Sequence, residues 1–530
     1  MNPQTAVPLR AGRREWIGLS VLALACLIYV MDLTVLHLAV PSLSADLQPS
    51  SAQLLWIIDI YGFMVAGFLV TMGTLGDRIG RRKLLFIGAA AFGVLSLLAA
   101  FAVSAEMLIL SRALLGIAGA TLAPSTLSLI FTMFQDPGQR SRAIAVWISA
   151  FSAGSAIGPL LGGVMLEFFW WGSVFLLALP VVALLLILGP FTLPEYKDPN
   201  AGRLDLLSVA MSLVAVLTVI FGLKQFAQDG FGVTPAAFVL VGLVVGTLFV
   251  RRQMTLADPM IDVRLFRVPA FSASLAVNFL TIFVAIGYFV FVAQYLQLVL
   301  GLSPLDAGVW SLPSAIAFIV GSNAAPRLLR YIRPAFLIGI ALGIAAFGLG
   351  ILSQVGGSGT NGLAIVVGSS VVISLGLAPV FGLTTELVVG SAPPERAGAA
   401  SGISESAFEL GGALGISLLG SIGIAIYRRD VADALPAGIP DEAAMVATDT
   451  LGGAVGIASE LPAQLAATVL EVAQDAFVQG MQVAAAISGV LAVGVALFAV
   501  AVLRNVSAGG EEQEPEPSRT SMDGALADPC

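Results

Sequence analysis

Long apolar runs separated by short polar connections extend along almost the whole chain. Fourteen of these runs reach about 20 residues, enough for a helix rising about 1.5 Å per residue to cross roughly 30 Å of hydrocarbon. The runs cover residues 16–40, 53–74, 84–103, 106–133, 142–167, 171–193, 205–224, 232–251, 270–299, 304–327, 335–354, 361–390, 397–427 and 476–503. The pattern predicts an all-α polytopic membrane protein with 14 transmembrane helices.

The basic residues provide a test of this count. With an even number of spans, both termini and the even-numbered connections lie on one side of the membrane. All but four of the 25 Lys and Arg residues fall in those segments, and the exceptions are Arg112, Lys224, Arg428 and Arg429. Since cytoplasmic connections are rich in Lys and Arg, we expect a multi-pass protein with both termini in the cytoplasm.

Three segments are not expected to span. Residues 194–204 are a polar connection, and residues 428–475 form a long acidic external loop. The part from 461 to 478 is amphipathic, and its periodicity leaves open whether it lies on the membrane or packs on the mouth of the protein. The predicted organisation is a six-helix bundle at 1–193, a linker with two inserted helices at 194–268, a second six-helix bundle at 269–506, and a disordered cytoplasmic tail at 507–530.

Composition agrees with a membrane protein and excludes several other classes. Hydrophobic residues make up 58% of the chain, charged residues 11%, and the mean hydropathy is +0.97, which no soluble core accommodates. The net charge of −8 gives no basic surface for nucleic acid. Cys26 and Cys530 offer no metal-ligand spacing, and the chain has no phosphate-binding loop or nucleophile–base pair. We therefore expect no enzyme activity, no cofactor and no metal.

Charged residues within the apolar runs are the first candidates for function. An ionised Asp near the centre of a spanning helix costs roughly 2.5–3.5 kcal/mol, so Asp32 is expected to face the interior of the bundle. Counted from the outer ends of their helices, Asp32, Asp59 and Arg112 lie at similar depths of about 10–12 Å. An Arg favours the charged carboxylate and burial favours the neutral acid, so this layer can exchange a proton. The alternative is an Asp with a permanent packing partner.

A second acidic pair lies in the thirteenth run. Glu405 and Glu409 share a helix face with Ser401 and Gly412, where two acids would attract a cationic ligand and compete for it with protons. Glu386 lies near the cytoplasmic end of the twelfth run, so we expect it to act at a gate. Aromatic side chains suited to cation–π contacts, although each could instead belong to the core, are Tyr29, Tyr61, Trp147, Phe151, Tyr288, Tyr295 and Trp310.

The connection between the second and third runs reads GTLGDRIGRRK at residues 73–83. Gly76 and Gly80 allow close approach of the backbone, and Asp77 can accept hydrogen bonds from a neighbouring helix N-terminus. The segment resembles the cytoplasmic signature of the major facilitator superfamily, and residues 321–334 resemble a degenerate copy of it. The residues that match the signature and carry its conformational role are Gly73, Gly76, Asp77, Arg78, Gly80, Arg81 and Arg82.

Two further patterns narrow the resemblance. The fifth run contains GSAIGPLLGG at residues 154–163, similar to the antiporter signature of the family, with Gly154, Gly158, Pro159, Gly162 and Gly163. Small residues at this spacing let helices approach closely. The first run, from Asp32 to Pro41, resembles the motif of the fourteen-helix drug:proton antiporters of the Qac, Smv and Lfr type. His37 stands where that motif has Asn, and we interpret it as a packing or pH-modulating residue rather than a required proton carrier.

The resemblance implies a monomer in a bacterial cytoplasmic (inner) membrane, with two six-helix bundles and an inserted helix pair. Its expected function is proton-coupled export of hydrophobic cations such as quaternary ammonium compounds, dyes and antibiotics, with protons and membrane lipid as the other partners. The tenth run has no acid after Asp306, which leaves divalent cations in doubt. The alternatives are export of an endogenous lipid-like, peptide or siderophore molecule, and a non-transporting membrane sensor.

Overall fold

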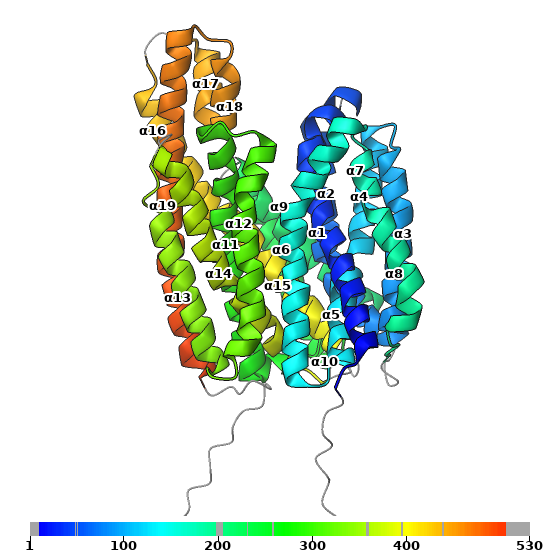
Figure 1. Cartoon of the computed structure of the whole chain (residues 1–530). Coiled ribbons are helices and arrows are strands. Elements are labelled where there is room, and N and C mark those ends of the chain that lie inside the picture. The colour runs from blue at the N-terminus through cyan, green and yellow to red at the C-terminus, as the bar shows by residue number, and fades with distance from the viewer. Residues whose placement is uncertain are drawn as a thin grey trace, which may run out of the picture.

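The computed structural model describes residues 10–47, 49, 51–197, 205–229, 232–256, 259–356, 360–393, 396–436 and 439–504. Every regular element within these ranges is a helix (Figure 1). We call the end at which α1 begins and α19 ends the lower end, and the end with α17 and α18 the upper end. The predicted tail at 507–530 and residues 198–204 of the predicted connection lie outside the described ranges.

The first bundle contains six long helical runs. Their elements are α1 (Arg13–Leu47), α2 (Ser51–Ile79), α3 (Arg81–Ala100), α4 (Ala105–Gly119), α5 (Leu122–Met133), α6 (Pro137–Phe168), α7 (Ser173–Leu176) and α8 (Ala178–Thr192). Helix α1 packs on α6 and α8, while α2 packs on α4. Large buried side chains such as Leu22, Ile57 and Phe92 fill the space between them.

Two of the predicted spans are divided by prolines. The run predicted at 106–133 breaks at Ala120 and Thr121 between α4 and α5. Pro124 has no N–H to donate to the Ala120 carbonyl, and the Thr121 hydroxyl donates to Ala118 O at 2.7 Å. In the same way, Pro180 has no N–H for the carbonyl of Leu176, where α7 ends.

The second bundle contains the other long runs and ends with the longest helix. Its elements are α11 (Pro269–Gln294) with the π-helical turn η2 (Tyr295–Val299), α12 (Pro304–Leu328), α13 (Pro334–Leu352), α14 (Thr360–Gly390), α15 (Ala397–Gly415), the π-helical turn η4 (Ile416–Gly420), α16 (Ser421–Ala434) and α19 (Ala463–Leu503). Helix α13 packs against α14 and α19. As in the first bundle, side chains such as Ile338 and Leu342 are fully buried between the helices.

Two helices between the bundles form the predicted inserted pair. They are α9 (Leu206–Asp229) and α10 (Val233–Thr255), and a short 3₁₀ helix, η1 (Val263–Arg267), leads into α11. Helix α9 packs on α2, while α10 packs mainly on α9. Outward-facing residues of α10 such as Leu240 and Leu243 are more than half exposed, as expected for a surface in contact with lipid.

Twelve helical segments among the described residues are long and apolar enough to cross a membrane. The other two predicted spans correspond to α6 and to the run from α15 to α16. Helix α6 packs between α1 and α12, and α15 packs between α2 and α11. These helices contact other helices along much of their length, so they can carry small and polar side chains. Such side chains give them a lower mean hydropathy than helices that face lipid. A 14-helix count is compatible with this arrangement.

The two bundles meet along α6 and α12 and along α2 and α15. In the first contact, the hydroxyls of Ser149 and Ser322 lie 2.8 Å apart, and Asn323 Nδ2 donates to Ser149 Oγ at 2.8 Å. In the second, a Cβ added to Gly402 would lie 2.9 Å from Leu69 O. This second contact is therefore a close approach of two helix backbones from different bundles.

The predicted external loop at 428–475 contains helices. The last turns of α16 continue above the bundle, followed by α17 (Asp441–Asp449), α18 (Leu451–Ala458) and the first turns of α19 (Figure 1). Tyr427 Oη donates to Ala447 O at 2.7 Å, and Arg428 pairs with Asp449. The amphipathic segment at 461–478 is thus largely the start of α19, and its apolar face packs on α16 and α18.

Candidate functional site

An ion pair joins α1 and α4 inside the first bundle. Arg112 Nη1 lies 2.6 Å from Asp32 Oδ2, and the two side chains are 1% and 9% exposed. Arg112 Nε also donates to Ile57 O at 3.2 Å, and its guanidinium lies 4.8 Å from the centroid of the Tyr61 ring. The predicted meeting of Asp32 and Arg112 is therefore present. The side chain of Asp59, the third charge of the predicted layer, lies outside the described set.

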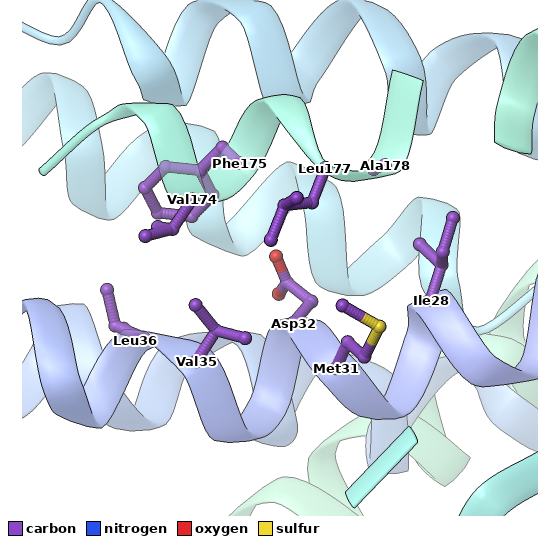
Figure 2. Close-up of a pocket in the computed structure, with 9 residues that line it drawn as sticks. All are labelled: Ile28, Met31, Asp32, Val35, Leu36, Val174, Phe175, Leu177 and Ala178. Carbon is purple, nitrogen blue, oxygen red and sulfur yellow. The ribbon is translucent and has the colours of Figure 1, made fainter. Parts of the chain in front are cut away.

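The Asp32 carboxyl also borders a small cavity of about 20 Å³ between α1 and the segment from α7 to the start of α8. Figure 2 shows the carboxyl pointing from α1 toward Phe175 and Leu177. Apart from Asp32, the residues lining the cavity are apolar. Its volume corresponds to about one water molecule, so Asp32 lies in a largely dry environment.

Four of the predicted aromatic residues form one group beside this pair. Tyr29 lies 6.3 Å from Tyr61 and 6.1 Å from Phe151 between ring centroids, and Phe151 lies 4.6 Å from Trp147. Trp147 Nε1 donates to the hydroxyl of Thr126, which also contacts Cys26 Sγ. Aromatic rings of α1, α2 and α6 are thus in contact with one another, and Tyr29, Tyr61 and Trp147 are buried. We call Tyr29, Tyr61, Trp147 and Phe151 the aromatic group.

Glu405 and Glu409 on α15 interact electrostatically with this aromatic group although they belong to the other bundle. Both carboxyls are within electrostatic reach of the Tyr29 hydroxyl. Glu409 is also within reach of the Tyr61 hydroxyl, which in turn interacts with Asp32 and Arg112. Tyr61 therefore interacts both with the ion pair of the first bundle and with Glu409 of the second.

The remaining candidate aromatic residues lie elsewhere. The Tyr288 hydroxyl lies near the hydroxyls of Ser314, Ser370 and Ser374 within the second bundle. Tyr295 Oη donates to Gly356 O at 2.9 Å in the upper part of that bundle, and Trp310 is 43% exposed. The side chain of His37 is not among those described. The structure thus groups only part of the predicted aromatic set around the two acids.

At the lower end, Asp77 connects the two bundles. Its Oδ1 accepts from Arg81 Nε at 2.8 Å, and its Oδ2 accepts from the backbone N–H of Ala399 in the first turn of α15 at 3.1 Å. The expectation that Asp77 accepts from a neighbouring helix N-terminus is confirmed. Arg81 is 1% exposed and also donates to Ser128 O. One buried carboxylate thus satisfies both an arginine and the start of a helix of the other bundle.

The turn at Gly80 has the positive φ that its sequence suggests, with a value of 111°. A Cβ there would lie 2.7 Å from Glu195 Oε1. Glu195 accepts from the backbone N–H of Arg82 at 3.2 Å, and Arg81 N donates to Tyr196 O at 3.0 Å. The connection after α8 therefore holds this turn in place. The motif analysis did not include Glu195 and Tyr196, although their position in a charged connection on the same side of the membrane was a usable signal.

Glu386 also lies between the bundles at the lower end. It is 7% exposed on α14, and its carboxyl lies close enough to Ser141 of α6 and to Arg140 to interact with both. The guanidinium of Arg140 lies 5.1 Å from the centroid of the Phe131 ring. The sequence pointed to Glu386 but not to Ser141, its partner across the bundle contact.

The glycines of the predicted antiporter motif lie on α6 and differ in their surroundings. A Cβ at Gly154 would lie 2.7 Å from Leu27 O, whereas none of the described atoms lies within 4 Å of a Cβ at Gly163. Gly158 and Gly162 are buried. The side chain of Pro159 lies outside the described set. Gly154 therefore allows the close packing of α6 on α1.

This difference gives a matched pair of substitutions. We expect Gly154→Ala to lower the free energy of unfolding by about 1–3 kcal/mol, since the new methyl group would overlap the α1 backbone. Gly163→Ala should be neutral or stabilising by up to about 1 kcal/mol, because alanine favours the helix. Thermal unfolding of both variants in detergent measures the difference. Equal melting temperatures would contradict the close approach at Gly154.

Comparison with known proteins places the chain in a family. A model of the Major Facilitator Superfamily matches residues 22–416. The chain is 44% identical to the multidrug efflux pump LfrA of Mycolicibacterium smegmatis, over 92% of this chain and 96% of that protein. It is 34% identical to the methyl viologen resistance protein SmvA of Salmonella typhimurium, over 91% and 97% of the two chains. The chain belongs to the Major Facilitator Superfamily.

Solved structures agree with this fold. The human organic anion transporter MFSD10 superimposes with a TM-score of 0.55 at 17% identity, over 91% of this chain and 99% of that one. A bacterial homolog of the lysosomal transporter Spinster gives a TM-score of 0.55 at 18% identity, over 93% and 99% of the chains. The family and the efflux-pump relatives identify the protein as a multi-pass membrane transporter, and these structures share its fold.

Proposed function

We propose that this protein is a proton-coupled drug exporter for hydrophobic, mainly cationic compounds. The observation that supports this most directly is the position of Tyr61, whose ring lies 4.8 Å from the Arg112 guanidinium and whose hydroxyl is within electrostatic reach of Asp32 and of Glu409 on α15. The candidate site combines two acids of the second bundle with the aromatic group and the buried ion pair of the first bundle. Its chemistry suits a flat organic cation, which gains from ring faces and from nearby negative charge. The name of LfrA, a multidrug efflux pump, supports drug export, and the compound in the name of SmvA, methyl viologen, is a flat organic cation.

In this proposal the lower end is cytoplasmic and the protein works as a monomer in a bacterial inner membrane. The enrichment of Lys and Arg in the predicted cytoplasmic connections supports this orientation. Protons enter down the electrochemical gradient, and each elementary charge that crosses gains about 2.3 kcal/mol per 100 mV. More protons than drug charges per cycle therefore drive export. The chain acts as a transporter and not as an enzyme.

The buried acids have separate roles in this mechanism. Glu405 and Glu409 bind the cation together with the aromatic group. Asp32 takes up a proton when its site opens to the outside, which weakens its attraction to Arg112 and favours reorientation of the bundles. Asp77 and Glu386 hold the cytoplasmic side closed while the cation leaves. The bound cation is thus exchanged for protons at sites on both bundles.

Proton release tests this proposal. We expect wild-type protein in detergent to release protons when monovalent organic cations are added, because binding favours the ionised carboxylates. Glu405→Gln or Glu409→Gln should weaken cation binding by about tenfold or more, consistent with the loss of a charged partner worth roughly 1.5–3 kcal/mol. Glu471→Gln, an exposed acid on α19, is the matched control. Unchanged affinity in both α15 variants would overturn the binding role of these acids.

A second candidate function is export of an endogenous molecule, with drugs as incidental substrates. It is favoured by 32% identity to the tetracenomycin C resistance and export protein of Streptomyces glaucescens, over 95% of this chain. The same cation panel, extended with neutral polycyclic compounds, decides between the two. Tighter binding of the neutral compounds than of any cation would favour the endogenous exporter.

A further inference from the structure

A short segment after α10 contacts both bundles at the lower end. It consists of Pro259, Met260 and Ile261, and we call it the bridging segment. Thr74 Oγ1 of α2 shares its proton between Val70 O of its own helix at 2.9 Å and Met260 O at 3.3 Å. Arg396, directly before α15, donates through Nη1 to Pro259 O at 3.2 Å. Consecutive carbonyls of one segment are thus hydrogen-bonded to the two helices that meet at this end.

Side-chain packing follows the same arrangement. Met260 is 1% exposed and packs with Val70 of α2 and Phe249 of α10. Ile261 contacts that cluster and a second one that includes Ala400 and Ile403 of α15. The bridging segment therefore fills the space between α2, α10 and α15, in addition to the direct contact of Asp77 with α15.

A buried glutamine of the inserted pair holds the bridging segment. Gln253 on α10 is 2% exposed, and its Oε1 accepts from Met260 N at 2.7 Å and from Ile261 N at 3.3 Å. Its Nε2 donates to Ser208 Oγ of α9 at 2.7 Å. The hydrogen bonds of this side chain thus connect the bridging segment to α9, the partner helix of the pair.

A charged network fixes the other side of the glutamine. Ser208 Oγ donates to Asp205 Oδ2 at 2.7 Å, and Arg252 Nε donates to the same oxygen at 2.8 Å. The hydrogen bond from Ser208, with further help from Arg252, lowers the pKa of Asp205. The carboxylate therefore stays charged at neutral pH, and α9, α10 and Gln253 form one connected unit.

We propose that the inserted helix pair acts as a latch, in which Gln253 positions the bridging segment so that it fastens α2 to α15. Opening of the lower end separates these two helices, which belong to different bundles. The bridging segment cannot keep Thr74, Arg396 and Gln253 as partners while they move apart. The latch therefore favours the conformation that is closed at the lower end, and Gln253 is a positioning residue for this closure.

The distance between spin labels on the two bundles tests this proposal. Gln135→Cys on the first bundle and Tyr331→Cys on the second are exposed positions at the lower end. The change Cys530→Ser removes one of the two native cysteines. The remaining one, Cys26, is buried. In full-length protein carrying these changes, we expect Gln253→Leu to raise the ratio of open to closed conformers by roughly 5- to 30-fold, a shift equal to a few hydrogen bonds.

Two further variants make the test decisive. Gln297→Leu is the matched control, since this exposed glutamine bonds only weakly to Ala293 O within its own helix, and it should leave the ratio unchanged. Thr74→Val removes the hydroxyl bonded to Met260 O and should shift the ratio in the same direction as Gln253→Leu. It decides the question if Gln253→Leu does not fold. An unchanged ratio in the folded latch variants, or an equal shift in the control, would overturn the latch. The readout needs no substrate, so its result is independent of the proposed export function.

Discussion

We expect the Asp32→Asn variant to fold and to bind organic cations but to lose proton-coupled efflux. The amide cannot exchange a proton, so binding and reorientation are no longer linked to proton uptake. The new side chain can still accept the hydrogen bond that Arg112 now donates to Asp32 at 2.6 Å. The loss of stability should therefore stay below the about 3–5 kcal/mol that follows removal of a buried ionic partner.

Efflux from proteoliposomes with an imposed proton gradient measures this effect. The control is Asp46→Asn, the same change on the same helix at an exposed position that accepts a hydrogen bond from Trp171. The control should keep efflux near the wild-type rate, while Asp32→Asn should fall to the rate of empty liposomes. Efflux retained by Asp32→Asn would show that another group carries the coupling proton.

The second large effect is expected at the lower end. Asp77→Ala leaves the buried Arg81 without its carboxylate and exposes the Ala399 N–H, which together should destabilise the closed conformation by at least about 3 kcal/mol. Ala400 is 0% exposed beside this contact, so a cysteine placed there in Cys530→Ser protein reports its opening. We expect the maleimide labelling rate at that position to rise by about 100-fold or more.

Asp136→Ala provides the comparison for this experiment. Asp136 is also a helix-capping aspartate at the lower end, but its carboxylate accepts from Gln139 N of its own helix at 2.8 Å. Its loss should weaken the start of α6 by about 1 kcal/mol without opening the contact between the bundles. Similar labelling rates in the two variants would mean that Asp77 acts on local stability alone.

The sequence predicted most of the fold because each membrane-spanning helix requires a long run of apolar residues, which is visible in the sequence. It also predicted the meeting of Asp32 and Arg112, since depth along a helix follows directly from a rise of about 1.5 Å per residue. The accepting role of Asp77 followed from the dipole of a neighbouring helix start. In each case one helix and one physical rule were enough.

Other features depended on which helices are neighbours in space, and the sequence does not encode that locally. Gln253 reads as an ordinary polar residue at the end of an apolar run, and only the fold brings it to Met260. The link between Glu386 and Ser141 crosses two bundles. The helical content of residues 441–458 was missed because acidic, alanine-rich segments are common both in loops and in short helices. Stabilisation of these helices comes from packing on α19, which is a tertiary effect.

Helix α19 continues without interruption over 41 residues, about 60 Å, from the lower end to the level of α17 and α18. Because α16, α17 and α18 all pack on α19, these upper elements move together with the second bundle, as if attached to the end of a rigid rod. A small tilt of that bundle is magnified at the tip of this rod. An epitope on α17 or α18 would then change its separation from the first bundle with each cycle, so a pair of fluorophores attached outside the membrane could follow turnover in intact cells.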